Sequence, residues 1–364
     1  MDRAQTAFFF LLRAGLWGEG TKTNEPSLFP LTEKEWTETY LLARKQTVMG
    51  IVFDGMVSLP RHCLPPMPLL MKWTAEVDRI ERMNRRMNKV VAELAQQFVA
   101  QGIKAVLLKG QGVGACYHAP LHRLCGDVDW CFPVKEDWKR ANSLIAANGI
   151  KMSAQAGFSL EYQWKDCLIE HHKRVLDVHN PFLSSYLKRL VNEEMPYGGE
   201  MVIEEVKVNT LSPLLIHLSV NLHILKHMLA FGIGLRQLCD AACMYRHYYK
   251  ETDGKRLEQV YRRVGIFRWM QVLHALLVKY LGVPVACLPF PPQEDEQSDW
   301  MMEDVLHAGN FGFYDERFGK QMGTLRRNNK VFHLLRRFKM NVCYAPAEAC
   351  WFPLVQMYSR VKKW

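Results

Sequence analysis

Apolar residues at helical spacing dominate the first hundred positions of the chain. They cluster around residues 7–17 and 39–53, which predicts helices within residues 1–59. Four prolines between positions 60 and 68 then mark a linker. Over residues 69–101, apolar side chains recur every three or four positions and charged side chains fill the other face. This pattern predicts one long amphipathic helix that ends at Gly102.

The pattern changes to short apolar runs after this helix. Runs of β-forming residues alternate with loops and one helical stretch, and Pro133 and Pro181 stop two of the runs. Mixed strands and helices in this order are typical of an α+β fold. The expected elements are strands at 104–109, 127–132, 167–171 and 174–179, and a helix at 135–147.

From residue 212 onward the spacing is helical again. We therefore predict an α+β fold in which a mixed β-sheet core lies between helical N-terminal and C-terminal regions. The expected division is 1–95, 96–182 and 183–364. The expected C-terminal helices cover residues 211–231, 235–249, 257–281 and 301–307.

Composition excludes several classes of protein. The chain has 364 residues, of which 49% are hydrophobic, so it is not disordered. Its ten cysteines contain no C-x-x-C pair, which argues against a zinc ribbon or a redox motif. Arg13 interrupts the apolar N-terminal run, so a helix entering a core is preferred there over a signal peptide. No apolar stretch is long enough to span a membrane, and we expect a cytoplasmic protein.

The net charge of +10 is concentrated at the C-terminus. Residues 317–364 contain eleven Lys or Arg and one acid, with aromatic residues interleaved. Such a basic tail suits a phosphate-rich partner such as RNA, a nucleotide or an anionic lipid. The alternative is the solvated face of amphipathic helices.

Two carboxylates on one predicted strand are the strongest candidate for chemistry. Asp127 and Asp129 stand two positions apart, so their side chains point to the same face. Asp177, on the predicted strand 174–179, is a candidate third carboxylate. Three converging carboxylates can hold Mg²⁺, with Mn²⁺ as the alternative ion. A solvated strand edge is the competing interpretation.

Basic and histidine side chains near these acids are candidates for substrate binding. Lys109 and Gly110 open a glycine-containing loop, and Lys109 and Arg123 are expected to hold phosphates; ordinary surface ion pairs are the alternative. His179 is expected to share a strand face with Asp177 and to contact substrate.

Two further helical pairs have structural alternatives. His223 and His227 stand at i and i+4 as a possible metal pair or a packed pair, and Arg236 and Asp240 at the same spacing are expected to form a structural ion pair.

The segment from Leu107 to Asp129 closely resembles the uncharacterised bacterial nucleotidyltransferase family of the DNA polymerase beta superfamily. Its elements are Leu-Leu-Lys-Gly at 107–110, Tyr117, Pro120, Arg123 and Asp-Val-Asp at 127–129. The resemblance extends through residues 176–179, 223–240 and 308–312. It implies a palm-like mixed sheet, with Asp127 and Asp129 as metal ligands and Asp177 as the third carboxylate. Gly110-Gln111 departs from the superfamily's usual Gly-Ser.

The expected activity is transfer of a nucleoside monophosphate from an NTP to an acceptor, with release of pyrophosphate. The acceptor is left open among RNA, protein, sugar and small molecules, and the basic tail at 317–364 is a candidate contact for nucleic acid. Two alternatives are a catalytically inactive relative that binds nucleotide or RNA, and an interaction protein whose carboxylates are surface charge.

Overall fold

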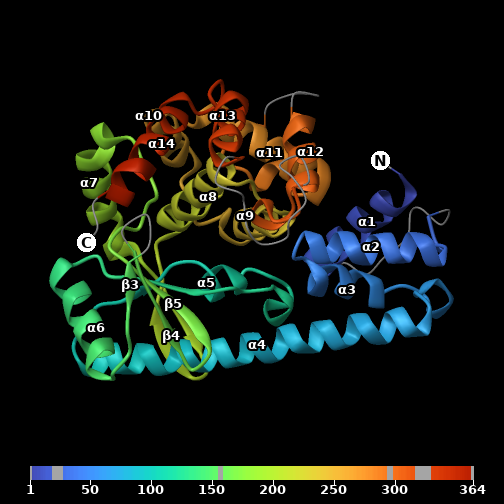
Figure 1. The fold of residues 1–364 in the computed structure, drawn as a ribbon, viewed down its shortest axis with the longest axis horizontal. Coiled ribbons are helices and arrows are strands. Elements are labelled where there is room, and N and C mark those ends of the chain that lie inside the picture. The colour runs from blue at the N-terminus through green and yellow to red at the C-terminus, as the bar shows by residue number, and fades with distance from the viewer. Residues whose placement is uncertain (1, 19–27, 155–158, 293–297, 316–328, 362–364) are drawn as a thin grey trace.

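The long helix predicted for residues 69–101 organises the whole molecule. In the computed structural model, helix α4 (Met67–Ala100) runs along one side, and the sheet and the other helices lie over it (Figure 1). Trp73 and Ile80, in its first half, face the N-terminal helices, whereas Val91 and Phe98, in its second half, face the sheet. The structure describes residues 2–18, 28–154, 159–292, 298–315 and 329–361.

Three short helices pack against the first half of α4. Thr32 and Glu35 form a capping box that starts the second of them. The first and third cross without room for side chains, because a Cβ on Gly15 would lie 1.8 Å from the carbonyl oxygen of Ile51. The three helices are α1 (Arg3–Trp17), α2 (Glu33–Lys45) and α3 (Met49–Val57).

A five-stranded mixed sheet packs against the second half of α4. Its strand order is β1-β2-β5-β4-β3, with β2 and β5 parallel and the other neighbours antiparallel. A separate hairpin, β6 with β7, also contacts α4. The strands are β1 (Val106–Leu107), β2 (Val128–Cys131), β3 (Ser153–Ala154), β4 (Ser159–Trp164), β5 (Cys167–His172), β6 (Glu200–Ile203) and β7 (Val206–Asn209).

Helices cover the sheet on the side away from α4 and continue to the C-terminus. Helix α8 is buried on nearly all sides and packs beside α9 at the centre of the C-terminal region (Figure 1). The remaining helices are α5 (Gln111–Gly114), α6 (Lys135–Ala147), α7 (Ser184–Glu194), α8 (Pro213–Ala230), α9 (Leu235–Tyr248), α10 (Gly254–Val264), α11 (Phe267–Leu281), α12 (Asp299–Ala308), α13 (Asn329–Asn341) and α14 (Pro346–Val361). Short 3₁₀ turns include Arg61–Cys63, η2 (Pro120–His122), Pro181–Leu183, Met195–Tyr197, Val285–Cys287 and Asn310–Gly312.

The hydrophobic core divides into two clusters, although the predicted division of the chain has three segments. One cluster joins the N-terminal helices to α8, α9 and α11, so the two ends of the chain share a core. The other lies between the second half of α4, the sheet and the β6–β7 hairpin. His122 in η2 joins α3 to α4, because its ring nitrogens lie 2.6 Å from Asp54 of α3 and 2.7 Å from Glu81 of α4.

The structure confirms the predicted α+β class but corrects two elements. Residues 174–179 are irregular and form no strand. The helix predicted for 257–281 is two helices, α10 and α11, separated by a left-handed turn at Gly265. Across the described residues, no helix has the length and apolar content that crossing a membrane would need.

Candidate active site

Strand β2 presents its carboxylate on the face opposite to the sheet's core. Val128 and Trp130 alternate into the core between the sheet and α4, whereas Asp129 points the other way. Asp127 precedes the strand by one residue and belongs to the same alternation. Asp129 is only 4% exposed, so its charge requires partners inside the protein.

The neighbouring strand supplies two of these partners. Because β2 and β5 are parallel, with Asp129 opposite Glu170 and Cys131 opposite His172, the side chains of Glu170 and His172 lie on the face of Asp129. His172 Nε2 lies 2.6 Å from Asp129 Oδ1 and 3.2 Å from Glu170 Oε2. Burial alone would lower the pKa of His172, but these two hydrogen bonds outweigh it and raise the pKa to about 9.

Lys109 brings a cation into this cluster from the end of β1. Gly110 follows it with a φ of 67°, and a Cβ there would lie 3.0 Å from the carbonyl oxygen of Asp127. The Lys109 ammonium lies 3.7 Å from Asp129 Oδ1 and 3.0 Å from His223 Nδ1. Burial opposes the charge of Lys109, but the surrounding carboxylates, Asp129 first, hold its pKa above the usual value.

The opposite wall is formed by α8 and the irregular segment that carries Asp177. Lys226 Nζ donates to Asp177 Oδ2 at 3.1 Å, and His223 Nδ1 lies 3.3 Å from the same oxygen. His227 Nε2 lies 3.0 Å from His223 Nε2, so the two histidines form a packed pair. Burial, reinforced by Lys109, lowers the pKa of His223 to about 4 and keeps the ring neutral. Asp177 therefore joins the site from the side opposite the strands, through His223, which also contacts Lys109.

The three aspartates differ in charge stabilisation. The charge of Asp129, followed by burial, raises the pKa of Asp127 to about 6. Burial would raise the pKa values of Asp129 and Asp177 as well, but cations outweigh it. Lys109 and His172 lower the pKa of Asp129, and Lys226 with His223 holds that of Asp177 well below its usual range. The site thus contains two firmly ionised aspartates and one that is easily protonated.

The residues fit a divalent cation. Donor atoms of Asp129, Glu170 and His172 all lie within 4.8 Å of one another. Carboxylate oxygens suit Mg²⁺, and the imidazole suits Mn²⁺ as well. Since His172 is protonated in its hydrogen bonds to the two acids, it becomes a ligand only by losing that proton.

Arg123 lies outside this cluster, and the phosphate-binding role expected for it stays a prediction. Its guanidinium is buried and makes two bonds to Asp240, from Nε to Oδ1 at 2.6 Å and from Nη2 to Oδ2 at 2.7 Å. Tyr117 donates its hydroxyl to the same carboxylate at 2.6 Å. Asp240 is therefore paired with Arg123, and the ion pair expected between Arg236 and Asp240 is absent from the described contacts.

His179 also has a structural partner. Its ring Nδ1 lies 3.0 Å from a carboxylate oxygen of Glu348 in α14, and its backbone N–H donates to the same carboxylate at 2.9 Å. The ring of Phe352 packs against it. The contact with substrate that was expected for His179 stays a prediction, and the shared strand face is wrong because residues 174–179 form no strand.

Glu170, like Lys226, is a site residue that no sequence motif identified. It stands two positions before His172 on a predicted strand, which is the same spacing that identified Asp127 and Asp129. That alternation was the available signal. The spacing could not show that β5 pairs with β2, and this pairing sets Glu170 opposite Asp129.

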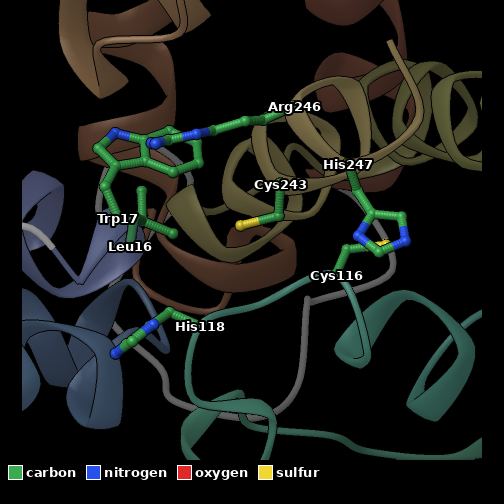
Figure 2. Close-up of a pocket in the computed structure, with 7 residues that line it drawn as sticks. All are labelled: Leu16, Trp17, Cys116, His118, Cys243, Arg246 and His247. Atoms are coloured by element: carbon green, nitrogen blue, oxygen red, sulfur yellow. The ribbon is translucent and has the colours of Figure 1, made fainter. Parts of the chain in front are cut away.

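The pocket in Figure 2 lies elsewhere, between α1, the loop after α5 and the end of α9. It has a volume of about 220 Å³, and its seven lining residues include no carboxylate. The guanidinium of Arg246 stacks on the ring of Trp17 at 4.6 Å, and burial raises the pKa of Cys116 to about 12. A thiol with so high a pKa is a poor nucleophile, so the carboxylate cluster is the better candidate for chemistry.

The predicted basic tail is only partly described. Arg317, Lys320, Arg326, Arg327, Lys362 and Lys363 lie outside the described residues. Arg337 in α13 is buried and paired with Asp304 and Asp315, whereas Lys339 is exposed. The contact with nucleic acid stays a prediction for this segment.

Comparison with known proteins identifies a family for most of the chain. Residues 32–282 match the model of a family described as uncharacterised nucleotidyltransferase. No curated protein matches the chain. A solved structure of an antigenic nucleotidyltransferase-like protein from Paracoccidioides brasiliensis matches with 15% identity and a TM-score of 0.33, over 54% of this chain and 92% of that one. Because the family model covers well over half of the sequence, the chain belongs to this family of uncharacterised nucleotidyltransferases.

Proposed function

We propose that the protein is a metal-dependent transferase that moves a nucleoside monophosphate from an NTP to an acceptor and releases pyrophosphate. The observation that carries this proposal is the gathering of Asp129, Glu170 and His172, with their donor atoms within 4.8 Å, beside Asp127 on one face of two parallel strands. Membership of the nucleotidyltransferase family supports it.

Asp127, Asp129 and Glu170 would hold Mg²⁺ or Mn²⁺, with His172 as a further ligand. Bound there, the ions would activate the attacking oxygen and neutralise charge on the leaving oxygen. Asp177 is the third carboxylate expected from the family resemblance. In the present geometry it holds Lys226 and His223 in place on the opposite wall, and we assign it this positioning role.

Most of the work left to the protein is positioning, because phosphoryl transfer depends chiefly on orientation and charge stabilisation. An oxygen of the acceptor forms a bond to the α-phosphorus, and the bond from that phosphorus to the bridging oxygen breaks. Pyrophosphate leaves with the bonding electrons, and a site carboxylate takes up the proton of the acceptor. Lys109 stands between the two walls, where its ammonium can balance charge on the phosphates.

The test is a transfer assay with α-labelled NTPs and a cell extract, with and without Mg²⁺. Label should appear in an RNA, protein, sugar or small-molecule fraction, which identifies the acceptor. Asp129→Asn should abolish labelling while the far-ultraviolet circular dichroism stays that of the parent. Asp166→Asn is a matched control, because Asp166 lies exposed at a turn with a φ of 62° that asparagine tolerates.

The alternative of an inactive nucleotide-binding relative rests on Lys109. An ammonium 3.7 Å from Asp129 already supplies part of the positive charge that a metal would bring. Thermal stabilisation by each NTP separates the two proposals. Stabilisation that requires Mg²⁺ supports the transferase, and stabilisation of equal size without Mg²⁺ supports the inactive relative. Full labelling by Asp129→Asn would refute the catalytic assignment.

A further inference from the structure

Among the described residues, Arg236 is a cation without an acidic partner. Its expected partner, Asp240, is occupied by Arg123, and no described carboxylate lies within ion-pair distance of the Arg236 guanidinium. One bond holds the group, from Nη1 to the carbonyl oxygen of Leu124 at 2.8 Å. Its Nε is buried and has no hydrogen-bond partner. A charge that is partly removed from water and left unpaired is costly, so its retention points to an anionic ligand.

Arg236 lies beside the carboxylate cluster. It donates to the carbonyl oxygen of Leu124, three residues before Asp127, and the ring of Phe311 contacts both Arg236 and His227 of the packed histidine pair. The two lysines of the site differ from it, because each has a carboxylate close by: Lys109 lies 3.7 Å from Asp129, and Lys226 lies 3.1 Å from Asp177.

An aromatic ring packs against the guanidinium. Phe311 lies in the 3₁₀ turn Asn310–Gly312, which follows α12. The centre of its ring is 5.8 Å from the Arg236 guanidinium carbon and 4.6 Å from the centre of the His227 ring. Its φ of 51° is unusual for a residue with a side chain. Asn310 fixes this turn to α9, since its Oδ1 accepts from Gln237 Nε2 at 3.2 Å. A cation–π contact occupies none of the guanidinium N–H groups, so those that do not bond Leu124 stay available for a ligand.

We propose, on the basis of the function proposed above, that Arg236 binds the phosphate chain of the nucleoside triphosphate and that Phe311 holds its guanidinium in the binding orientation. A guanidinium presents paired donors that match two phosphate oxygens, which the ammonium of a lysine does not. Arg236 thus takes the role that the sequence suggested for Arg123, and the change of partner at Asp240 leaves it free to do so.

The experiment measures binding of inorganic tripolyphosphate and of NTPs to the full-length chain by calorimetry in the presence of Mg²⁺. Arg236→Met should weaken both about 10- to 100-fold, because one charge-assisted phosphate contact is lost. Arg236→Lys should recover only part of the affinity, and Phe311→Leu should weaken binding less than Arg236→Met. Arg82→Met is the control, because Arg82 forms an exposed i,i+4 pair with Asp78 on α4 and should bind like the parent.

A purely structural role would give a different result. Since Arg236 has no acidic partner among the described residues, Arg236→Met should unfold within about 2 °C of the parent. Parental affinity in a folded Arg236→Met protein overturns this inference and leaves the proposed function standing. If that variant does not fold, Arg236→Lys decides, and parental affinity there overturns the inference.

Binding by the parent separates the two proposals. A parent that binds tripolyphosphate through Arg236 but binds no NTP supports the anion site and overturns the proposed function. A parent that binds neither overturns both.

Discussion

The buried pair of Arg123 and Asp240 should be one of the strongest single contributors to stability. The two side chains are 5% and 12% exposed and share two hydrogen bonds, and Tyr117 adds a third bond to Asp240. Arg123→Met leaves the carboxylate buried with only a hydroxyl partner. Loss of one member of such a pair costs about 3–5 kcal/mol.

This loss can be expressed as a shift in the unfolding temperature. Unfolding entropy is about 2.1 cal/mol/K per residue, so a loss of 3–5 kcal/mol in a chain of this length lowers the midpoint by about 4–7 °C. Circular dichroism during heating measures the midpoint, and urea titration measures the free energy of unfolding. Arg82→Met, which breaks an exposed pair, should shift the free energy by less than about 1 kcal/mol.

A double variant tests the reason for the loss. Arg123→Met combined with Asp240→Leu removes both charges, so it should be more stable than Arg123→Met alone. If Arg123→Met unfolds at the parental temperature, the buried pair of Arg123 and Asp240 does not stabilise the fold, which contradicts the prediction. Folded Arg123→Met should bind tripolyphosphate as the parent does, because the guanidinium of Arg123 is buried and bonded to Asp240. Weaker binding would restore the phosphate role first expected for Arg123.

Two other substitutions test the packing of the N-terminal helices. Gly15→Ala should destabilise the protein by at least about 1–3 kcal/mol, because its Cβ would lie 1.8 Å from the Ile51 carbonyl oxygen. Gly126→Ala is the control, because a Cβ there would meet nothing within 4 Å. Urea titration measures the free energy of unfolding of both variants. His122→Gln should also destabilise, since the hydrogen bonds to its two carboxylates, opposed by burial, raise the pKa of His122 above 6.5. The stabilisation that protonated His122 contributes is fully present below pH 6.5 and is lost as pH rises through the pKa of His122 in the folded protein. The loss of unfolding free energy caused by His122→Gln should therefore shrink above pH 6.5, and a loss that grows there would contradict the argument.

Local patterns predicted the parts of the fold that depend on local spacing. The helix at 135–147 and the strand around Asp129 follow from periodicity within one segment, and the structure has both. Residues 174–179 also read as a strand, but the backbone N–H groups of His179 and Asn180 donate to the carboxylate of Glu348. That partner lies about 170 residues away, so no local pattern could reveal it.

The same distinction separates the two walls of the site. The carboxylate wall could be predicted because Asp127 and Asp129 stand on one strand, and the spacing of Glu170 and His172 repeats that signal on the strand beside it. The opposite wall comes from α8 and the irregular segment that carries Asp177, and the start of α9 and the turn at Phe311 lie beside it. Tertiary packing alone brings these parts together.

Partner choice is where the sequence interpretation of this wall failed. Spacing of i and i+4 makes Arg236 and Asp240 neighbours on one helix face, but spacing of this kind stabilises an isolated helix by only about 0.2–0.5 kcal/mol. Arg123 instead offers Asp240 a buried, two-bond contact, and leaving that guanidinium unpaired would cost several times more. Asp240 therefore pairs with Arg123, and Arg236 is left beside the carboxylate cluster, where an anionic substrate would neutralise its charge.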